Sequence, residues 1–339
     1  TVYPECSLEE SGTMGPIATS CAWVKRTANL ILPRGRFARS VSILAGGTAL
    51  GQALTVLVSP ILTRLYSPED FGVFGVYASL LGIVTVIASL RYEYAIPLPE
   101  EDETAANILV LCFGLLLGMT LFSWLVIQSL GHQVVTWANV PGLEPYLWLI
   151  PLGVLGAGTY QILNYWAIRK RDFTRISRTR ISRGVGRAAI QVGVGFGSSS
   201  PLGLLLGQLA GETAGSASLG LAAWRKDRNA FKAVSLRGMR NAGSRYMRFP
   251  LLSSWGSLLD SLGAQVPQIL FAAFYGAQVA GWFALGQRVI AAPLNIVVDS
   301  VAQVYFGEAA RLSRDDPRAM RRLFLKLTGR LALVGGLPV

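Results

Sequence analysis

Long stretches without charge alternate with short polar connectors along most of the chain, from about residue 41 onward. A transmembrane helix needs roughly 20 apolar residues to cross about 30 Å of hydrocarbon, and these stretches have about that length. The pattern therefore predicts an all-α, polytopic membrane protein. The expected spans are 41–62, 71–90, 105–130, 145–168, 181–197, 202–224, 249–274 and 279–305, and a further apolar stretch begins near Leu323.

The uncharged region Ala188–Gly211 permits two interpretations, a single span or two spans that turn at Ser198–Pro201. The flanking segments 169–187 and 225–248 hold eight basic residues each. Basic residues collect in cytoplasmic loops, so an even number of crossings must separate these segments, and two spans are predicted. The same rule places the N-terminus in the cytoplasm and gives eight complete helices and the start of a ninth.

The composition agrees with a membrane protein, because 52% of the residues are hydrophobic and only 15% are charged, against about 25% charged in soluble domains. The net charge is +12, but no polar, soluble module carries a basic patch, so no nucleic-acid partner is expected. The three cysteines and the single histidine, His132, do not have the spacing of a metal site or a catalytic triad. No metal, cofactor or catalytic residue is expected, and the protein is not expected to be an enzyme.

The pattern Tyr-x5-Gly-x-Phe at residues 66–74 recurs at 275–283, an offset of 209 residues. Six predicted helices separate the two copies, which predicts two six-helix lobes in a parallel repeat, an arrangement common in transporters. About 12 helices in full would need roughly three more beyond Val339, so the chain is expected to be C-terminally truncated. The expected parts are a cytoplasmic tail 1–35 that is possibly spurious, a first lobe 36–224, a basic cytoplasmic linker 225–248 and an incomplete second lobe 249–339.

Several motifs are distinctive: Arg64 with SPEDFG at 67–72, RYE at 91–93 with AIP at 95–97, GLLLGQLAG at 203–211, RYMRFPL at 245–251 and ALGQRVIAAPL at 284–294. Through them the chain resembles the polysaccharide-transporter, or oligosaccharide (O-antigen) flippase, family over about 39–330. That family belongs to the multidrug/oligosaccharidyl-lipid/polysaccharide exporter superfamily. The expected absence of most of the second lobe's last four helices departs from the family pattern.

The resemblance implies a multi-pass protein of the bacterial inner membrane. Such a protein moves undecaprenyl-diphosphate-linked oligosaccharide to the periplasmic leaflet for lipopolysaccharide O-antigen, capsule or exopolysaccharide. Its expected partners are this lipid-linked substrate, membrane lipids, and the polymerase and glycosyltransferases of the same pathway. The motifs specify neither the glycan nor a coupling ion.

Two alternatives remain. One is a drug exporter or a peptidoglycan-precursor flippase of the same superfamily. The other is a membrane polysaccharide polymerase or lipid-dependent glycosyltransferase. The second is disfavoured because such enzymes need catalytic groups outside the membrane, and the longest predicted outer loop has about fourteen residues.

Ionisable residues inside the predicted spans are candidate substrate-binding residues, because charge is costly there. Arg180, Arg183 and Arg187 are spaced three and four residues apart and share one helix face. The planar guanidinium fork suits the diphosphate of a lipid carrier. The alternative is that Arg180 and Arg183 extend to lipid head groups at the end of the helix.

Arg187 and Glu212 each lie twelve and a half residues from the centre of the SSSP turn, at one depth in an antiparallel hairpin. They form either a structural ion pair or a pair that opens to substrate or to a proton.

Asp260 and Arg288 are mid-span in the last two complete helices. They either face the cavity, with Gln265 and Gln268 as hydrogen-bond partners for sugar, or form a packed ion pair. Glu212 and Asp260 are the candidates for cation coupling. Residues at the span ends are gate or interfacial candidates: Arg64, Glu69, Asp70, Arg91, Tyr92 and Glu93.

Overall fold

Helices make up all the regular secondary structure in the part of the chain that the computed structural model describes, residues 36–197, 200–315, 324–325 and 328–329. Residues 40–311 form one compact unit. The expected tail 1–35 lies outside the described residues, as does most of the apolar stretch that begins near Leu323.

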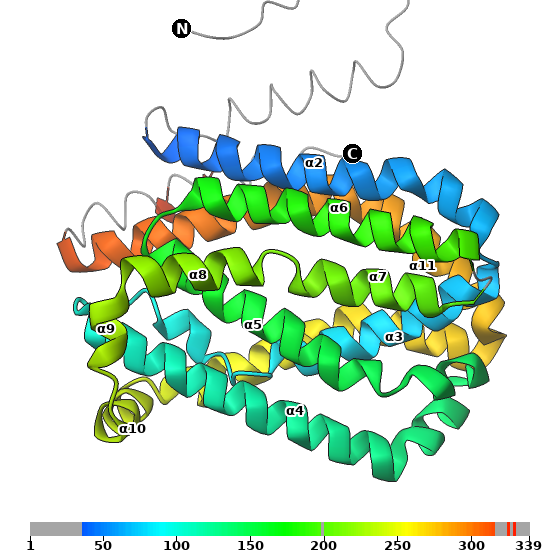
Figure 1. The fold of residues 1–339 in the computed structure, drawn as a ribbon, viewed down its shortest axis with the longest axis horizontal. Coiled ribbons are helices and arrows are strands. Elements are labelled where there is room, and N and C mark those ends of the chain that lie inside the picture. Colours follow the sequence, from blue (N-terminus) through cyan, green and yellow to red (C-terminus); the bar gives the residue numbers. More distant parts are fainter. Residues whose placement is uncertain (1–35, 198–199, 316–323, 326–327, 330–339) are drawn as a thin grey trace, which may run out of the picture. The chain divides into compact units, whose positions relative to one another are not determined.

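The first five long helices overlap the first five expected spans, and consecutive helices run in opposite directions across the view (Figure 1). The sixth expected span is a helix broken at Gly215, whose φ of 92° only glycine adopts readily. The bounds are α2 Arg36–Leu65, α3 Pro68–Val86, α4 Asp102–Ala138, α5 Leu149–Arg169, α6 Phe173–Gly197, α7 Leu202–Thr213 and α8 Ser216–Lys226. Turns of 3₁₀ helix at Tyr92–Ala95 and Pro141–Tyr146 connect α3, α4 and α5.

The predicted linker carries two short helices, α9 (Arg228–Lys232) and α10 (Leu236–Arg245). A π-helical turn, Phe249–Ser253, leads into α11 (Ser254–Asp315). Gly276, with φ 83° and ψ 173°, interrupts α11. The two parts of α11 on either side of Gly276 therefore correspond to the last two complete spans expected from the sequence.

Four helices among the described residues are long and apolar enough to cross a membrane: Arg39–Leu65, Pro68–Val86, Asp102–Ala138 and Phe249–Arg288. The other expected crossings fall on α5, on the arginine-rich α6, on the broken pair α7–α8, and on the remainder of α11. The all-α, polytopic fold class is confirmed. The count of eight crossings stays a prediction.

The turn between α2 and α3 is a helix cap. The Asp70 backbone N–H donates to Ser67 Oγ over 3.2 Å, and the Ser67 backbone N–H donates to Asp70 Oδ2 over 2.9 Å. Arg64 and Glu69 are exposed, and within the described residues neither they nor Asp70 form an ion pair. Asp70 thus caps the N-terminus of α3. A gate or interfacial role for Arg64, Glu69 and Asp70 stays a prediction.

The two copies of the sequence repeat contact each other. A Cβ atom on Gly72 would collide with the carbonyl oxygen of Ala277, and one on Gly281 would collide with the carbonyl oxygen of Pro68. Ala277 and Gly281 follow Pro68 and Gly72 at the same offset of 209 residues. The two contacts are therefore equivalent, like the paired contacts across a two-fold axis. They join α3 to the part of α11 next to Gly276.

Buried and exposed side chains separate by helix. Most of α5 is buried, and α3 buries the whole stretch 71–73 together with Val76 and Tyr77. In contrast, α4 exposes large apolar side chains, and Trp137 near its end is 84% exposed. An exposed apolar face is expected where a helix borders lipid.

Candidate functional site: an arginine-lined cavity

A cavity of about 260 Å³ lies between α2, α5 and α6 and also touches α11. All three arginines of the α6 stripe line it. The polar and aromatic residues that accompany them are Thr48, Gln52, Thr55, Tyr160, Asn164 and Gln303. Sequence reasoning missed these companions, since single threonines and amides in apolar helices gave no distinctive signal.

Arg183 is held on three sides. Its Nε donates to the Gly211 carbonyl oxygen over 2.7 Å, and its Nη2 forms an ion pair with Glu212. Its guanidinium lies 4.1 Å from the ring centroid of Tyr160, close enough for cation–π attraction. Arg183 is therefore fixed in orientation.

Arg187 is held less firmly. Its Nη2 lies 3.3 Å from Glu212 Oε1, which also accepts a hydrogen bond of 3.0 Å from Gln208. Its Nε is buried without a hydrogen-bond partner among the described residues. The structure thus brings Arg187 and Glu212 together, as the depth argument predicts, and adds Arg183 as a second partner.

Arg180 lies at the other end of the stripe, where its Nη1 donates to Thr48 Oγ1 on α2. The three arginines and Glu212 give the cluster a net charge of +2. Most of each side chain is out of solvent: 23% of Arg183, 25% of Arg187 and 16% of Glu212 are exposed. Such a site attracts anions, because Arg183 and Arg187 are poorly solvated and share the single negative charge of Glu212.

Of the two alternatives for Asp260 and Arg288, the packed ion pair does not form. Asp260 is exposed on α11, whereas Arg288 Nη2 donates to Gln191 Oε1 of α6 over 3.4 Å. A difference in depth around a hairpin does not fix which side of a helix a residue occupies, and Arg288 lies on the side that meets α6.

The two predicted glutamines lie at the contact of α11 with α3. Gln268 is 3% exposed and donates to the Ala280 carbonyl oxygen over 3.0 Å across the bend of α11. Gln265 faces Gly82 of α3. Neither glutamine lines the arginine cavity.

The Arg91–Glu93 segment connects three helices at the opposite end of α3 from the Gly72 contact. Buried Glu93 accepts hydrogen bonds from Ser89 and, over 2.7 Å, from Gln161 of α5. Arg91 lies 3.5 Å from Glu93, and the Tyr92 hydroxyl donates to the Gly243 carbonyl oxygen of α10 over 2.9 Å. These contacts hold α5 and α10 to the end of α3.

An aromatic cluster that the sequence did not reveal adjoins this segment. The ring of Tyr94 lies 5.1 Å from Tyr165, 6.5 Å from Phe249 and 5.8 Å from Phe306. Arg91 donates to the Tyr94 hydroxyl over 2.8 Å. Phe249 precedes α11, and Phe306 lies near its end, beyond the bend at Gly276. The cluster therefore joins the expected first lobe to both parts of α11.

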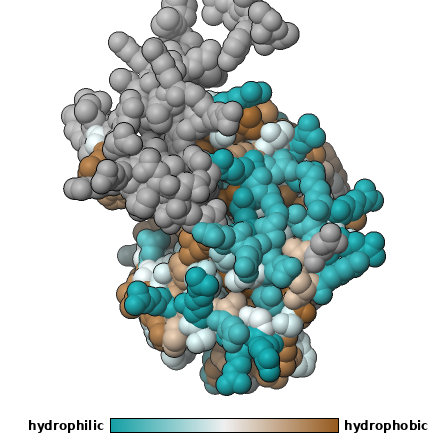
Figure 2. Space-filling model, turned by 90° about the vertical axis from the view of Figure 1, so that its left-hand side faces the viewer, coloured by the Kyte–Doolittle hydropathy of each residue, from teal (hydrophilic) through white to brown (hydrophobic). Residues whose placement is uncertain are grey.

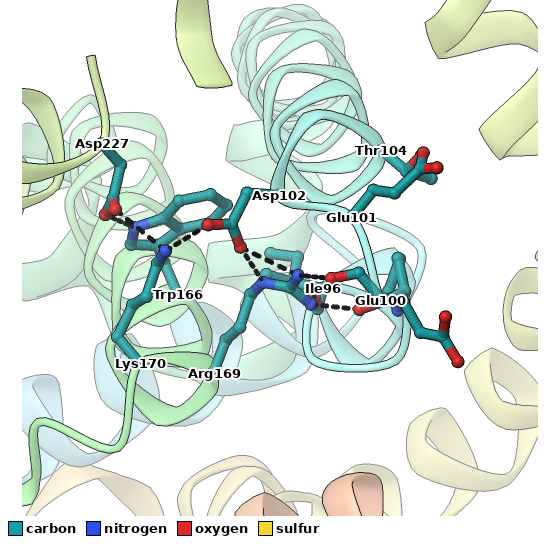
Figure 3. Close-up of polar contacts among 10 residues, drawn as sticks. Ile96, Glu100, Glu101, Asp102, Thr104, Trp166, Arg169, Lys170 and Asp227 are labelled. Atoms are coloured by element: carbon teal, nitrogen blue, oxygen red, sulfur yellow. Dashed lines mark hydrogen bonds and ion pairs between the residues drawn. The ribbon is translucent and has the colours of Figure 1, made fainter. Parts of the chain in front are cut away.

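Arg169, at the end of α5, fastens the connector before α4 (Figure 3). Its side chain is 7% exposed, and its guanidinium donates to the carbonyl oxygens of Pro99 and Glu100 over 2.6 and 3.0 Å and to Asp102 Oδ1 over 2.9 Å. Backbone acceptors carry no sequence signal, so these contacts could not be anticipated.

Arg169→Lys is expected to lower the free energy of unfolding by about 2 kcal/mol, since an ammonium cannot replace the fork and leaves buried carbonyl groups unpaired. Unfolding of the purified protein in detergent, followed by circular dichroism, measures the change. Arg237→Lys, on the exposed side of α10, is the matched control and should change little. Equal stability of the two variants would contradict the fastening role.

A family model matches most of the chain, and one curated relative covers a similar stretch. Residues 61–338 match a family described as polysaccharide biosynthesis protein. The succinoglycan biosynthesis transport protein ExoT of Rhizobium meliloti (strain 1021) is 24% identical over 281 residues, which cover 80% of the chain. The chain spans 53% of that relative's length.

Two solved structures share the fold. A MOP superfamily transporter from Pyrococcus furiosus superimposes with a TM-score of 0.58 at 15% identity, over 89% of this chain and 70% of that one. A MATE in complex with Br-NRF superimposes with a TM-score of 0.54 at 16% identity, over 89% of this chain and 75% of that one.

Proposed function

The chain belongs to the family of polysaccharide biosynthesis proteins, and we propose that it forms part of a flippase that moves a lipid-linked oligosaccharide across a membrane. Its relatives among known proteins are transporters. We further propose that the carrier lipid is undecaprenyl diphosphate, that the membrane is the bacterial inner membrane, and that the N-terminus is cytoplasmic. The glycan would be a surface polysaccharide.

The arginine cavity is the observation that supports this proposal. A diphosphate diester carries two negative charges at neutral pH, and three arginines line the cavity, two of which share the single carboxylate of Glu212. Arginine is the side chain best suited to phosphate oxygens, since its donors match them in pairs. The cavity is small for an oligosaccharide but adequate for a phosphate group, so the sugars would lie outside it.

The contacts assign different tasks to the arginines. Arg183 keeps its orientation through the Gly211 carbonyl oxygen and the Tyr160 ring. Arg187, with a long contact to Glu212 and an unpaired Nε, is the arginine that can exchange its partner for a phosphate. Glu212 then compensates the charge of Arg187 while substrate is absent, and a proton on Glu212 would free Arg187 in the same way.

Translocation of a fluorescent undecaprenyl-diphosphate oligosaccharide in proteoliposomes tests the proposal. Arg187→Ala should reduce the rate roughly tenfold or more, because a charge-assisted contact is worth about 1.5–3 kcal/mol. Arg178→Ala, on the exposed side of the same helix, is the control and should transport normally.

The double variant Arg187→Ala/Glu212→Ala separates the two interpretations of the pair. Transport should stay low, because the phosphate ligand is still missing. Recovery to the normal rate would show that the pair is only structural and would contradict the role of Arg187. Transport of a drug cation with no transport of the glycolipid would instead favour a drug exporter of the same superfamily.

A further inference from the structure

A second cavity, of about 410 Å³, lies at the end of the molecule where α5 and α8 end and α6 begins. Figure 2 shows hydrophilic residues gathered over this end. One part of the lining is apolar: Leu163, Trp166, Ala167, Leu219, Ala222 and Ala223. The other part is charged: Lys170, Arg171, Asp172, Arg175, Lys226 and Asp227.

The two kinds of lining lie at different depths. In α5 the apolar residues at 163–167 precede the charges at 170–172, and in α8 those at 219–223 precede the charges at 226–227. The charged residues of the lining therefore lie at the C-terminal ends of α5 and α8, beyond the apolar residues. Trp224 stacks on Phe231 with 6.0 Å between the ring centroids, and Trp166 lies tilted against the same ring at 5.3 Å. Tryptophan is typical of the boundary between membrane and water.

Four basic and two acidic residues give the rim a net charge of +2. Lys170 is committed to two partners, since its Nζ lies 2.6 Å from Asp102 Oδ2 and 2.8 Å from Asp227 Oδ1. Burial alone would lower the pKa of Lys170, but these two hydrogen bonds outweigh burial and raise it. Lys170 therefore stays charged and orders the rim rather than binding a ligand.

Arg175 and Lys226 are held loosely by comparison. Arg175 Nε lies 3.6 Å from Asp172 Oδ2, and Lys226 Nζ lies 3.8 Å from the same oxygen. Both distances are longer than a hydrogen bond. The other oxygen, Oδ1, accepts a hydrogen bond of 3.2 Å from the Arg175 backbone N–H at the start of α6. An anion can therefore bind to the Arg175 and Lys226 side chains without the loss of a short hydrogen bond.

We propose that this cavity binds an anionic phospholipid of the surrounding membrane. Arg175 and Lys226 bind the phosphate, and the first methylenes of an acyl chain lie against Leu163 and Leu219. A soluble phosphate would use only the rim and leave the apolar layer unfilled, whereas an amphiphile fills both layers. The volume lies within the usual range for ligand sites, and the net positive charge attracts anionic lipid. This site is separate from the arginine cavity and does not rest on the proposed transport activity.

The test uses a phosphatidylglycerol with a diazirine in its acyl chain, added to the purified protein in phosphatidylcholine nanodiscs. After illumination, labelled peptides are identified by mass spectrometry. Labelling within 163–175 and 219–227, displaced by unlabelled phosphatidylglycerol but not by glycerol 3-phosphate, is the expected result. Labelling confined to other helices would overturn the proposal, and so would equal displacement by glycerol 3-phosphate.

Variants locate the two halves of the site. Arg175→Gln/Lys226→Gln should reduce labelling roughly tenfold or more, because two charge-assisted contacts to phosphate are lost. Arg225→Gln/Arg228→Gln removes the same charge from exposed neighbours outside the cavity and should label normally. Ala222→Phe fills the apolar layer and should reduce labelling while the charges stay in place. This variant tests the proposed site if the Arg175→Gln/Lys226→Gln variant does not fold. Undiminished labelling in either cavity variant would overturn the proposal.

Discussion

Glu212→Gln is expected to lower the free energy of unfolding by about 3 kcal/mol, the lower part of the range for one lost partner of a buried ion pair. Glu212 compensates both Arg183 and Arg187, and its side chain is only 16% exposed. Glutamine keeps the shape and the contact with Gln208 but removes the charge. Two arginines then remain in a poorly solvated site without a carboxylate, and denaturant titration in detergent micelles measures the loss.

Two further variants control this result. Glu69→Gln removes an exposed acid that forms no ion pair among the described residues, so its effect should stay within about 0.5 kcal/mol. Glu212→Gln/Arg187→Gln should be more stable than Glu212→Gln alone, since one uncompensated charge is gone. If both Glu212 variants are as stable as the unaltered protein, solvent already screens the cluster and the carboxylate does not hold it.

The spans could be predicted because uncharged runs of this length have few structural uses other than crossing a membrane. The break between α7 and α8 could not be predicted. It rests on Gly215, one of the 37 glycines in the chain, and nothing in the local sequence marks it as the one with positive φ. Gly276, at the tip of a predicted turn, was easier to anticipate.

The candidate site was predictable where residues share one helix. Spacing of three and four placed the arginines on one face of α6, and the predicted turn at Ser198–Pro201 gave the depth of Glu212. Depth alone does not give the direction in which a side chain leaves its helix. The second partner of Glu212 could therefore not be predicted, and neither could the contact of Arg288 with Gln191, which excludes the ion-pair alternative for Asp260. Contacts such as Tyr94 with Phe306 join segments 212 residues apart and leave no local pattern.

Gly72→Ala is expected to separate α3 from α11, because its Cβ atom would collide with the Ala277 carbonyl oxygen, a backbone atom that no side-chain rotation can move. Overpacking of this kind costs about 1–3 kcal/mol. Gly281→Ala should cost a similar amount, since its contact with Pro68 is the equivalent one across the repeat. The free energy of unfolding in detergent measures both. Gly118→Ala is the control, because nothing lies within 4 Å of its Cβ position, and it should be neutral or stabilising by up to about 1 kcal/mol.

The double variant Gly72→Ala/Gly281→Ala tests whether the two glycines form one contact. Either alanine alone forces the same two backbones apart, so the second should then fit with little additional loss. We therefore expect the double variant to be clearly more stable than the sum of the single losses allows, as is usual for residues that share a contact. Additive losses would mean that α3 and α11 yield independently at the two positions. In that case the two copies of the repeat would be similar in sequence only, and the Gly72 and Gly281 contacts would stabilise the packing of α3 on α11 independently.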